Sequence, residues 1–227
     1  MTIWFTSDQH FYHTNIIRLA NRPFHNVEEM HETLIMNWQQ AVKDDDLVYC
    51  LGDFSWQFQK IPQLLERLPG RKVLIVGNHS KCFKEIYGIS SGTKYTDFYK
   101  HAGFSEIYRS LVIDIAGQLV NLSHFPYRND DPEPTYDDRY RAMRLVNDGR
   151  WLIHGHIHQR RMLQDRMINV SVEVTDYKPV SLETIARIIR NDNDCHSQFD
   201  NTSTISLQNL TSINNPLQSG LGEEKPD

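Results

Sequence analysis

Short apolar runs that end in polar side chains recur along this chain. Five of them span residues 3–6, 47–51, 73–76, 118–122 and 151–153, and most are rich in Val, Ile or Leu. A continuous apolar run of this length, bounded by Gly or polar residues, is typical of a buried strand. The pattern therefore predicts a core built around these five strands.

Apolar positions at helical spacing lie between these runs. The longest such segment covers residues 27–42 and begins after Asn26, a suitable N-cap, with Glu29 three residues later. We also expect a helix over residues 64–68 stopped by Pro69-Gly70, a hairpin over residues 107–123 turning near Gly117, a helix around Tyr136, Tyr140 and Met143, and a last helix beginning at Ser181. Strands and helices alternating in this way favour layers of helix around a two-sheet centre.

Each predicted strand is followed by side chains that can bind a metal ion. In chain order these are Asp8, His10, Asp53, Asn78, His124, His156 and His158. Because ligands bind at the carboxyl ends of strands in open α/β sheets, we expect all seven to share one site. Seven donors are too many for one tetrahedral ion and enough for two ions with open positions.

The donor types indicate which metals suit the site. Imidazole and carboxylate together favour Mn, Fe, Ni or Zn, and the lack of thiolates argues against a soft metal. Two ions about 3.5–4 Å apart usually need a bridging carboxylate, and such pairs clamp the oxygens of an in-line phosphoryl displacement. Asp53 is the expected bridge, because it follows an early and central strand.

The order and spacing of these motifs resemble a known family. Five blocks covering about residues 3–158 resemble the signature blocks of the calcineurin-like metallophosphoesterase superfamily: Asp8-Gln9-His10, Gly52-Asp53, Gly77-Asn78-His79, His124, and Gly155-His156-Ile157-His158. Residues 5–11 and 169–181 are similar to a small prokaryotic and phage branch of predicted phosphoesterases. The resemblance implies an α/β fold of two packed mixed sheets flanked by helices, in four αββα layers.

The resemblance also implies roles for individual residues. One metal ion would be held by Asp8, His10, Asp53 and His158, and the other by Asp53, Asn78, His124 and His156. The implied ions are divalent, with Mn first and Fe, Ni, Zn or Mg as alternatives. A hydroxide bridging them would attack phosphorus in line, with Asp53, Asn78 and His79 as the catalytic set. His79 would face the phosphate and protonate the leaving oxygen or stabilise its charge. Family members commonly have an acidic residue after the Asn-His pair, whereas this chain has Ser80.

Length and charge set the boundaries of the expected domain. The 227 residues suit one domain over residues 1–190, followed by a polar tail over residues 191–227. The tail holds six acidic residues and one Lys, for a net charge of −5, so the remaining 23 basic and 23 acidic residues cancel. A neutral domain with an acidic tail lacks the basic footprint of a nucleic-acid-binding protein. We expect the tail to be disordered because its composition is mainly polar.

The remaining composition bears on compartment. No N-terminal stretch has the pattern of a signal peptide, and no apolar run approaches the length of a membrane span. The three cysteines do not indicate a disulfide framework. We therefore expect a cytoplasmic protein, and the sequence leaves its oligomeric state open.

Substrate contacts are expected from residues that follow the ligands. His13 lies three residues after His10, and Arg22 and Arg128 follow the first and fourth ligand loops. Arginines at a cleft rim, Arg160 and Arg161 included, could hold a second phosphate through paired hydrogen bonds. His154 is either a residue that orients a ligand or a simple buried histidine, and His31 is expected to be a packed core histidine.

These observations predict a dinuclear phosphoesterase that acts on a phosphomonoester or phosphodiester. The expected substrate is a small phosphoester, and a nucleotide-like compound is one candidate. Two alternatives stay open at this stage. One is a metal-dependent nuclease acting on nucleic-acid ends, and the other is a protein-binding scaffold that kept the fold without catalysis.

Overall fold

The computed structural model describes residues 1–128 and 140–203, with side chains described as far as Asp192. The chain divides into two compact units, Met1–Ile189 and Arg190–Asp227. The first unit holds both sheets. The final helix, α6 (Leu182–Ser203), crosses from the first unit into the second, and the rest of the predicted tail lies outside the described residues.

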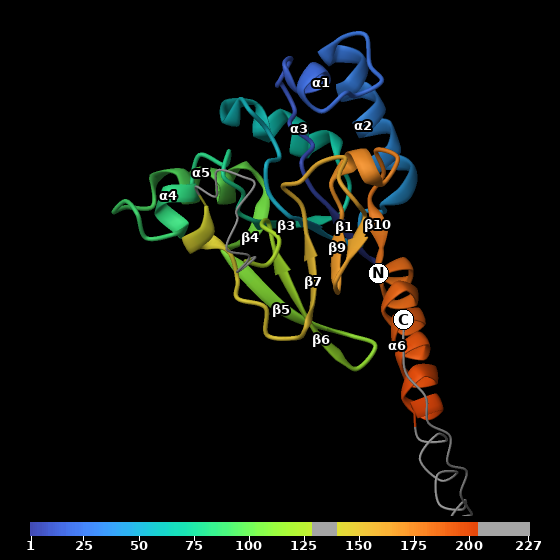
Figure 1. Ribbon diagram of the computed structural model, residues 1–227. Coiled ribbons are helices and arrows are strands. Elements are labelled where there is room, and N and C mark those ends of the chain that lie inside the picture. Colours follow the sequence, from blue (N-terminus) through green and yellow to red (C-terminus); the bar gives the residue numbers. More distant parts are fainter. Residues whose placement is uncertain (129–139, 204–227) are drawn as a thin grey trace, which may run out of the picture. The chain divides into compact units, whose positions relative to one another are not determined.

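The first sheet has five strands in the order β10-β1-β2-β3-β4 (Figure 1). Its bounds are β1 (Ile3–Thr6), β2 (Leu47–Cys50), β3 (Arg71–Ile75), β4 (Phe104–Tyr108) and β10 (Val180–Ser181). Strands β1 to β4 are parallel, and the two-residue β10 pairs antiparallel to β1. Strand β2, which precedes Asp53, is therefore the central strand, as the sequence predicts.

The second sheet also has five strands, in the order β5-β6-β7-β9-β8. Its bounds are β5 (Ser110–Ile115), β6 (Gln118–Ser123), β7 (Trp151–His154), β8 (Leu163–Gln164) and β9 (Met167–Asn169). The predicted hairpin is formed by β5 and β6, which turn at Ala116 and Gly117, whereas β6, β7 and β9 run parallel. Two mixed sheets flanked by helices confirm the predicted fold class.

Helices connect the strands and cover the first sheet. They are α1 (Ile16–Leu19), α2 (Val27–Ala41), α3 (Ile61–Arg67), α4 (Phe83–Ile86) and α5 (Lys94–Ala102), with 3₁₀ turns η1 (Phe58–Lys60), η2 (Arg141–Met143) and η3 (Val172–Val174). The helix expected around Tyr136–Met143 is wrong in its described part, because residues 141–143 form only the turn η2. Residues 129–139 lie outside the described part of the chain.

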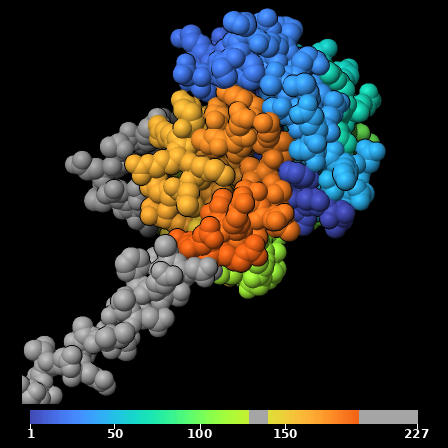
Figure 2. All heavy atoms as spheres, turned by 90° about the vertical axis from the view of Figure 1, so that its right-hand side faces the viewer, coloured from blue at the N-terminus to red at the C-terminus, as the bar shows by residue number. Residues whose placement is uncertain are grey.

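Two buried apolar clusters hold these layers together. In the first cluster, α2 and α3 pack through residues such as Trp38 and Leu64 onto Val48 and Leu74 of the first sheet. The second cluster lies between the sheets and joins residues such as Tyr49 to residues such as Ile153. In the space-filling view, orange residues lie between the blue residues of α2 and the yellow residues, and the red-orange start of α6 lies below them (Figure 2). Within the described residues, no helix combines the length and apolar character needed to cross a membrane.

Helix α2 begins with the cap that the sequence predicts. The side-chain oxygen of Asn26 accepts a hydrogen bond of 2.8 Å from the backbone N–H of Glu29. The carboxylate of Glu29 in turn accepts from the backbone N–H of His25, one residue earlier than in a standard capping box. The cap fixes where α2 begins, close to the loop that follows α1.

We expect Asn26→Ala to lower the free energy of unfolding by about 1 kcal/mol, because a backbone N–H loses its side-chain acceptor. Urea unfolding would measure this change. Asn15→Ala is the matched control, since Asn15 caps α1 without a side-chain hydrogen bond. An equal loss of stability in both variants would contradict the assignment.

Candidate metal centre

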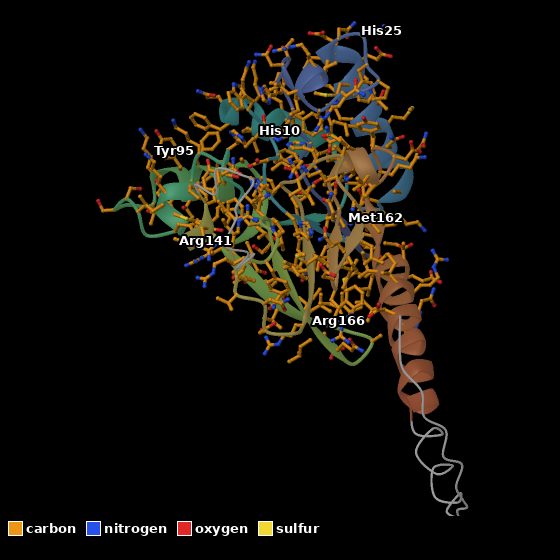
Figure 3. The ribbon with its side chains drawn as sticks, in the orientation of Figure 1. His10, His25, Tyr95, Arg141, Met162 and Arg166 are labelled. Atoms are coloured by element: carbon orange, nitrogen blue, oxygen red, sulfur yellow. The ribbon has the colours of Figure 1, made fainter. Side chains whose placement is uncertain are left out.

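The seven predicted ligands meet where strand ends from the two sheets face each other. Strands β1, β2 and β3 deliver ligands from the first sheet, and β6 and β7 deliver them from the second. Backbone hydrogen bonds join the loops, from the N–H of His10 to the carbonyl of Asp53 (3.0 Å) and from the N–H of Gly155 to that of His124 (3.0 Å). His10 is labelled in Figure 3, at the upper edge of the sheets.

Donor atoms gather in two overlapping groups. Potential ligand atoms of Asp8, His10 and His158 lie within 4.8 Å of one another, as do those of Asp8, Asp53 and His124. Asp53 is central, because its Oδ2 lies 3.7 Å from Nε2 of His10 and 3.4 Å from Nε2 of His124. The same nitrogen of His124 lies 3.1 Å from Oδ1 of Asn78.

His156 adds a further imidazole to the cluster, beside His124. Its ring centroid lies 5.1 Å from that of His124, and it is partly buried. Burial lowers the pKa of His156 to about 2, so its imidazole is neutral and carries a free lone pair. A neutral imidazole is the form that binds a metal ion.

The two carboxylates each use one oxygen for the protein and present the other to the centre. Oδ2 of Asp8 accepts hydrogen bonds of 2.8 Å from the hydroxyl of Ser171 and from the N–H of His156. Oδ1 of Asp53 accepts a bond of 2.9 Å from the N–H of His79. Oδ1 of Asp8 and Nε2 of His10 are buried without any hydrogen-bond partner.

Buried polar atoms normally have partners, so two unpartnered buried atoms 3.8 Å apart fit a group that both can bind. The imidazole and carboxylate donors here suit a divalent cation. Burial keeps the pKa of His10 well below its usual value, which leaves its nitrogen available for a metal. The residues present therefore fit a divalent metal ion.

Neighbouring groups fix the orientation of two of the imidazoles. Nδ1 of His124 lies 2.7 Å from the carbonyl of Leu51, which only accepts, so Nδ1 carries the proton and Nε2 faces the centre. Nδ1 of His158 lies 2.8 Å from the carboxylate of Glu173, with the same consequence. Burial lowers the pKa of His158, but the hydrogen bond to Glu173 and the negative charges of Asp8 and Glu173 together raise it above its usual value.

The backbone of the ligand loops adopts a conformation that non-glycine residues rarely use. The φ angles are positive at Asp8 (60°), His10 (52°), Asp53 (49°), His156 (72°) and His158 (49°). Left-handed backbone at such residues costs free energy and concentrates at functional sites. The left-handed backbone occurs at five of the seven predicted ligands, whose side chains lie around one point.

Two glycines make the close approach of the loops possible. A Cβ atom on Gly77 would collide with the Asp53 carboxylate, and one on Gly155 would collide with the side chains of Ser7 and Asp8. The glycines of the Gly-Asn-His and Gly-His-Ile-His motifs are therefore required by space. No larger residue fits without moving a ligand.

His79 occupies the solvent side of the centre. Its side chain is 41% exposed, and its Nε2 lies 4.0 Å from Oδ2 of Asp53. The hydroxyl of Ser80 accepts a bond from the N–H of Gly77, so Ser80 closes the loop that carries Asn78. Among the described residues, Asp53 is the only acidic residue that pairs with the His79 ring. In this described part of the chain, the Ser80 side chain forms no hydrogen bond to that ring.

The predicted substrate contacts differ in their placement. His13 lies beside the centre, with its Nδ1 3.4 Å from Nδ1 of His10, and its ring stacks on Trp56 at a centroid distance of 4.1 Å. The side chain of Arg128 is half-buried, and its backbone N–H donates to Leu145.

The rim position expected for Arg22 is wrong. Arg22 is only 4% exposed and donates to the backbone carbonyls of Asp8 (2.6 Å) and Gln9 (2.8 Å) and to the carboxylate of Glu173 (2.7 Å). Arg22 is therefore a buried residue that holds the Asp8-Gln9-His10 loop through its backbone carbonyls. The sequence offers no sign of this, because the partner Glu173 lies 151 residues away.

Two other histidines behave as structural residues. Nδ1 of His154 contacts the carbonyl of Gly155, and burial lowers the pKa of His154 to about 4. Nε2 of His31 accepts from the N–H of Tyr12 and packs within the first core, as predicted for a core histidine.

Sequence reasoning gave no role to Glu173, Ser171 or Trp56. The first two belong to the 169–173 segment, whose only signal was its place in the resemblance. Trp56 follows the Asp53 loop and is 51% exposed, which is unusual for a side chain of its size.

Two hollows adjoin the centre. One of about 310 Å³ is lined by His10, His13, His79, His158, Trp56 and residues of α1. The other, of about 640 Å³, begins at Asn78 and His79 and extends over α4 and α5. Trp56 and His79 line both hollows, so a molecule bound at His79 can extend in either direction.

Comparison with known proteins places this arrangement in a family. The chain is 38% identical over 197 residues to an uncharacterized protein of Methanocaldococcus jannaschii, covering 82% of this chain and 90% of that protein. It is 35% identical over 184 residues to the gene 66 protein of Mycobacterium phage L5, covering 75% of this chain and 86% of that one. A solved structure of a protein of unknown function from Aquifex aeolicus is 32% identical, with a TM-score of 0.62 over 82% of this chain and 98% of that one.

The sequence model of calcineurin-like phosphoesterases matches residues 1–160, which carry every predicted ligand. That match agrees with the two mixed sheets and with the donor groups at their shared edge. The chain therefore belongs to the calcineurin-like phosphoesterase family and is a metal-dependent phosphoesterase.

Proposed function

We propose that this protein hydrolyses a small phosphomonoester or phosphodiester at a centre of two divalent ions. The observation that carries the proposal is the position of Asp53, whose Oδ2 lies 3.7 Å from Nε2 of His10 and 3.4 Å from Nε2 of His124. A buried carboxylate close to an imidazole of each proposed ligand set is suited to bridge two ions.

The other donors gather around His10 and around His124. Asp8 and His158 join His10 in one group of ligand atoms, and Asp8 also lies with Asp53 and His124 in the other. Asn78 and His156 lie beside His124. We take Asp53 as the member common to both ligand sets because its Oδ2 lies within 3.7 Å of Nε2 of both His10 and His124. Mn is the first choice of metal because the donors are imidazole and oxygen.

Bound divalent ions would lower the pKa of water and offset the charge of the phosphate. The chain supplies the remaining functions. Oδ1 of Asp53 accepts a hydrogen bond from the backbone N–H of His79, so the proposed bridging carboxylate and the loop that carries His79 are held together. His79, exposed on the solvent side, would protonate the leaving oxygen or stabilise its charge.

The first test is hydrolysis of p-nitrophenyl phosphate and bis-p-nitrophenyl phosphate by protein stripped with EDTA and reloaded with Mn, Ni, Zn or Mg. We expect turnover to return with metal and to be abolished in Asp53→Ala. His79→Ala should keep its metal and lose about 10²–10⁴-fold in kcat, because it lacks the acid but retains the ligands.

The matched control is His101→Ala, which removes an exposed histidine of α5. It should leave kcat unchanged. The ratio of the two esters separates a monoesterase from a diesterase. Full activity in Asp53→Ala, or metal-independent turnover in the stripped protein, would contradict the proposal.

The buried pair of Arg22 and Glu173 supports the proposed centre from behind. Glu173 accepts from Nδ1 of His158 and from Arg22, whose other donors hold the carbonyls of the Asp8 loop. Groups that orient a metal-binding histidine change metal affinity through its orientation and basicity. We therefore propose that Glu173 positions His158 for its ion.

We expect Glu173→Gln to weaken Mn binding by roughly 10–100-fold, because the neutral amide no longer fixes the imidazole or balances Arg22. Equilibrium dialysis against Mn measures the effect, with circular dichroism to confirm that the variant is folded. Glu66→Gln, an exposed change on α3, is the control. Unchanged Mn affinity in folded Glu173→Gln would exclude a positioning role.

A further inference from the structure

The larger of the two hollows carries positive charge that the proposed chemistry does not use. It begins at His79 and is lined along its length by Trp56, Lys81, Lys84, Lys94 and Tyr95. Its volume of about 640 Å³ is typical of a site for a small organic ligand. Figure 3 places Tyr95 and His10 along the same upper side of the molecule.

Three lysines line this hollow without acidic partners. Within the described residues, Lys81, Lys84 and Lys94 form no ion pair, whereas Arg22, Arg67 and Lys178 each pair with a carboxylate. All three side chains are exposed. They converge from the Asn78 loop, from α4 and from the first turn of α5.

Glu85, the acidic residue among those that line the hollow, already accepts hydrogen bonds from neighbouring residues. Both carboxylate oxygens of Glu85 accept hydrogen bonds, from the backbone N–H of Tyr95 (3.0 Å) and from the N–H and hydroxyl of Thr96 (2.7 and 2.8 Å). Glu85 therefore joins α4 to α5 and does not pair with the lysines. In a chain with a net charge of −5, this leaves a local surplus of positive charge beside the metal centre.

Two of the aromatic residues that line the hollow, Trp56 and Tyr95, contact neighbouring side chains. One face of Trp56 covers His13, at an interplanar angle of 12°, while half of the Trp56 side chain remains exposed next to His79. Tyr95 lies under the ammonium groups of Lys81 (5.3 Å) and Lys94 (5.6 Å). Cations held over a ring are kept in place near the hollow.

We infer that this hollow is a subsite for a second phosphate of the substrate, one nucleoside unit away from the phosphate that reacts. The inference rests on the proposed function, since it requires the reacting phosphate to lie at His79. The exposed part of Trp56 offers a flat face for the base, and the lysines neutralise the second phosphate. The small volume and the net negative charge of the chain favour a mononucleotide or dinucleotide over a polynucleotide.

The test is a pair of probes that differ by one phosphate. Thymidine 5′-phosphate and thymidine 3′,5′-bisphosphate are titrated into Mn-loaded protein by calorimetry, with chromatography to confirm that both remain intact. We expect the bisphosphate to bind about tenfold more tightly at low salt, through added charge-assisted contacts. The preference should shrink as NaCl rises from roughly 50 to 500 mM, because exposed charges are screened.

The variants locate the subsite. In the double variant Lys84→Gln and Lys94→Gln, the preference should fall to within about threefold, whereas Lys100→Gln, an exposed lysine of α5 outside the hollow, should retain it. Equal binding of the two probes, or a preference that survives the double variant, would overturn the inference. Calorimetry needs no turnover, so the two ideas can fail separately. A clear preference for the bisphosphate in a protein that hydrolyses neither ester would contradict the proposed function and still support the subsite.

Discussion

The structure depends on a buried negative charge at the point where its two sheets meet. Asp53 lies at the end of the central strand of the first sheet and is almost fully buried. Burial alone would raise the pKa of Asp53, but the charge of His124 and its contact with the carboxylate lower it well below its usual value. A charge placed there requires positive or polarisable partners on every side. The ligand loops of both sheets supply them.

This requirement shapes the backbone around the centre. Several ligands lie in left-handed conformations, and Gly77 and Gly155 are needed so that neighbouring loops can touch the carboxylates. Arg22 holds the Asp8 loop through backbone carbonyls and is itself balanced by Glu173. The strain of the loops is thus offset by buried hydrogen bonds and by two apolar cores that hold the sheets together.

The sequence predicted those parts that have a local signal. Strands β1, β2, β3, β6 and β7 have four to six residues each and contain the apolar runs, and α2 has both periodicity and a cap, so their positions could be predicted directly. Strands β8 and β10 have two residues each, which is too short for any periodic pattern, and both depend on a partner strand. Arg22 was misplaced and Glu173 was given no role for the same reason: a pairing across 151 residues leaves no trace in local sequence. The aromatic and lysine lining of the larger hollow also arises only from the tertiary fold.

Anomalous diffraction from a crystal soaked in Mn would test the central claim directly. Two ions bridged by the Asp53 carboxylate would give two peaks about 3.5–4 Å apart. One peak would be nearest His10 and His158, and the other nearest Asn78 and His124. A single peak at these residues, or no peak at all, would contradict a centre of two ions bridged by Asp53.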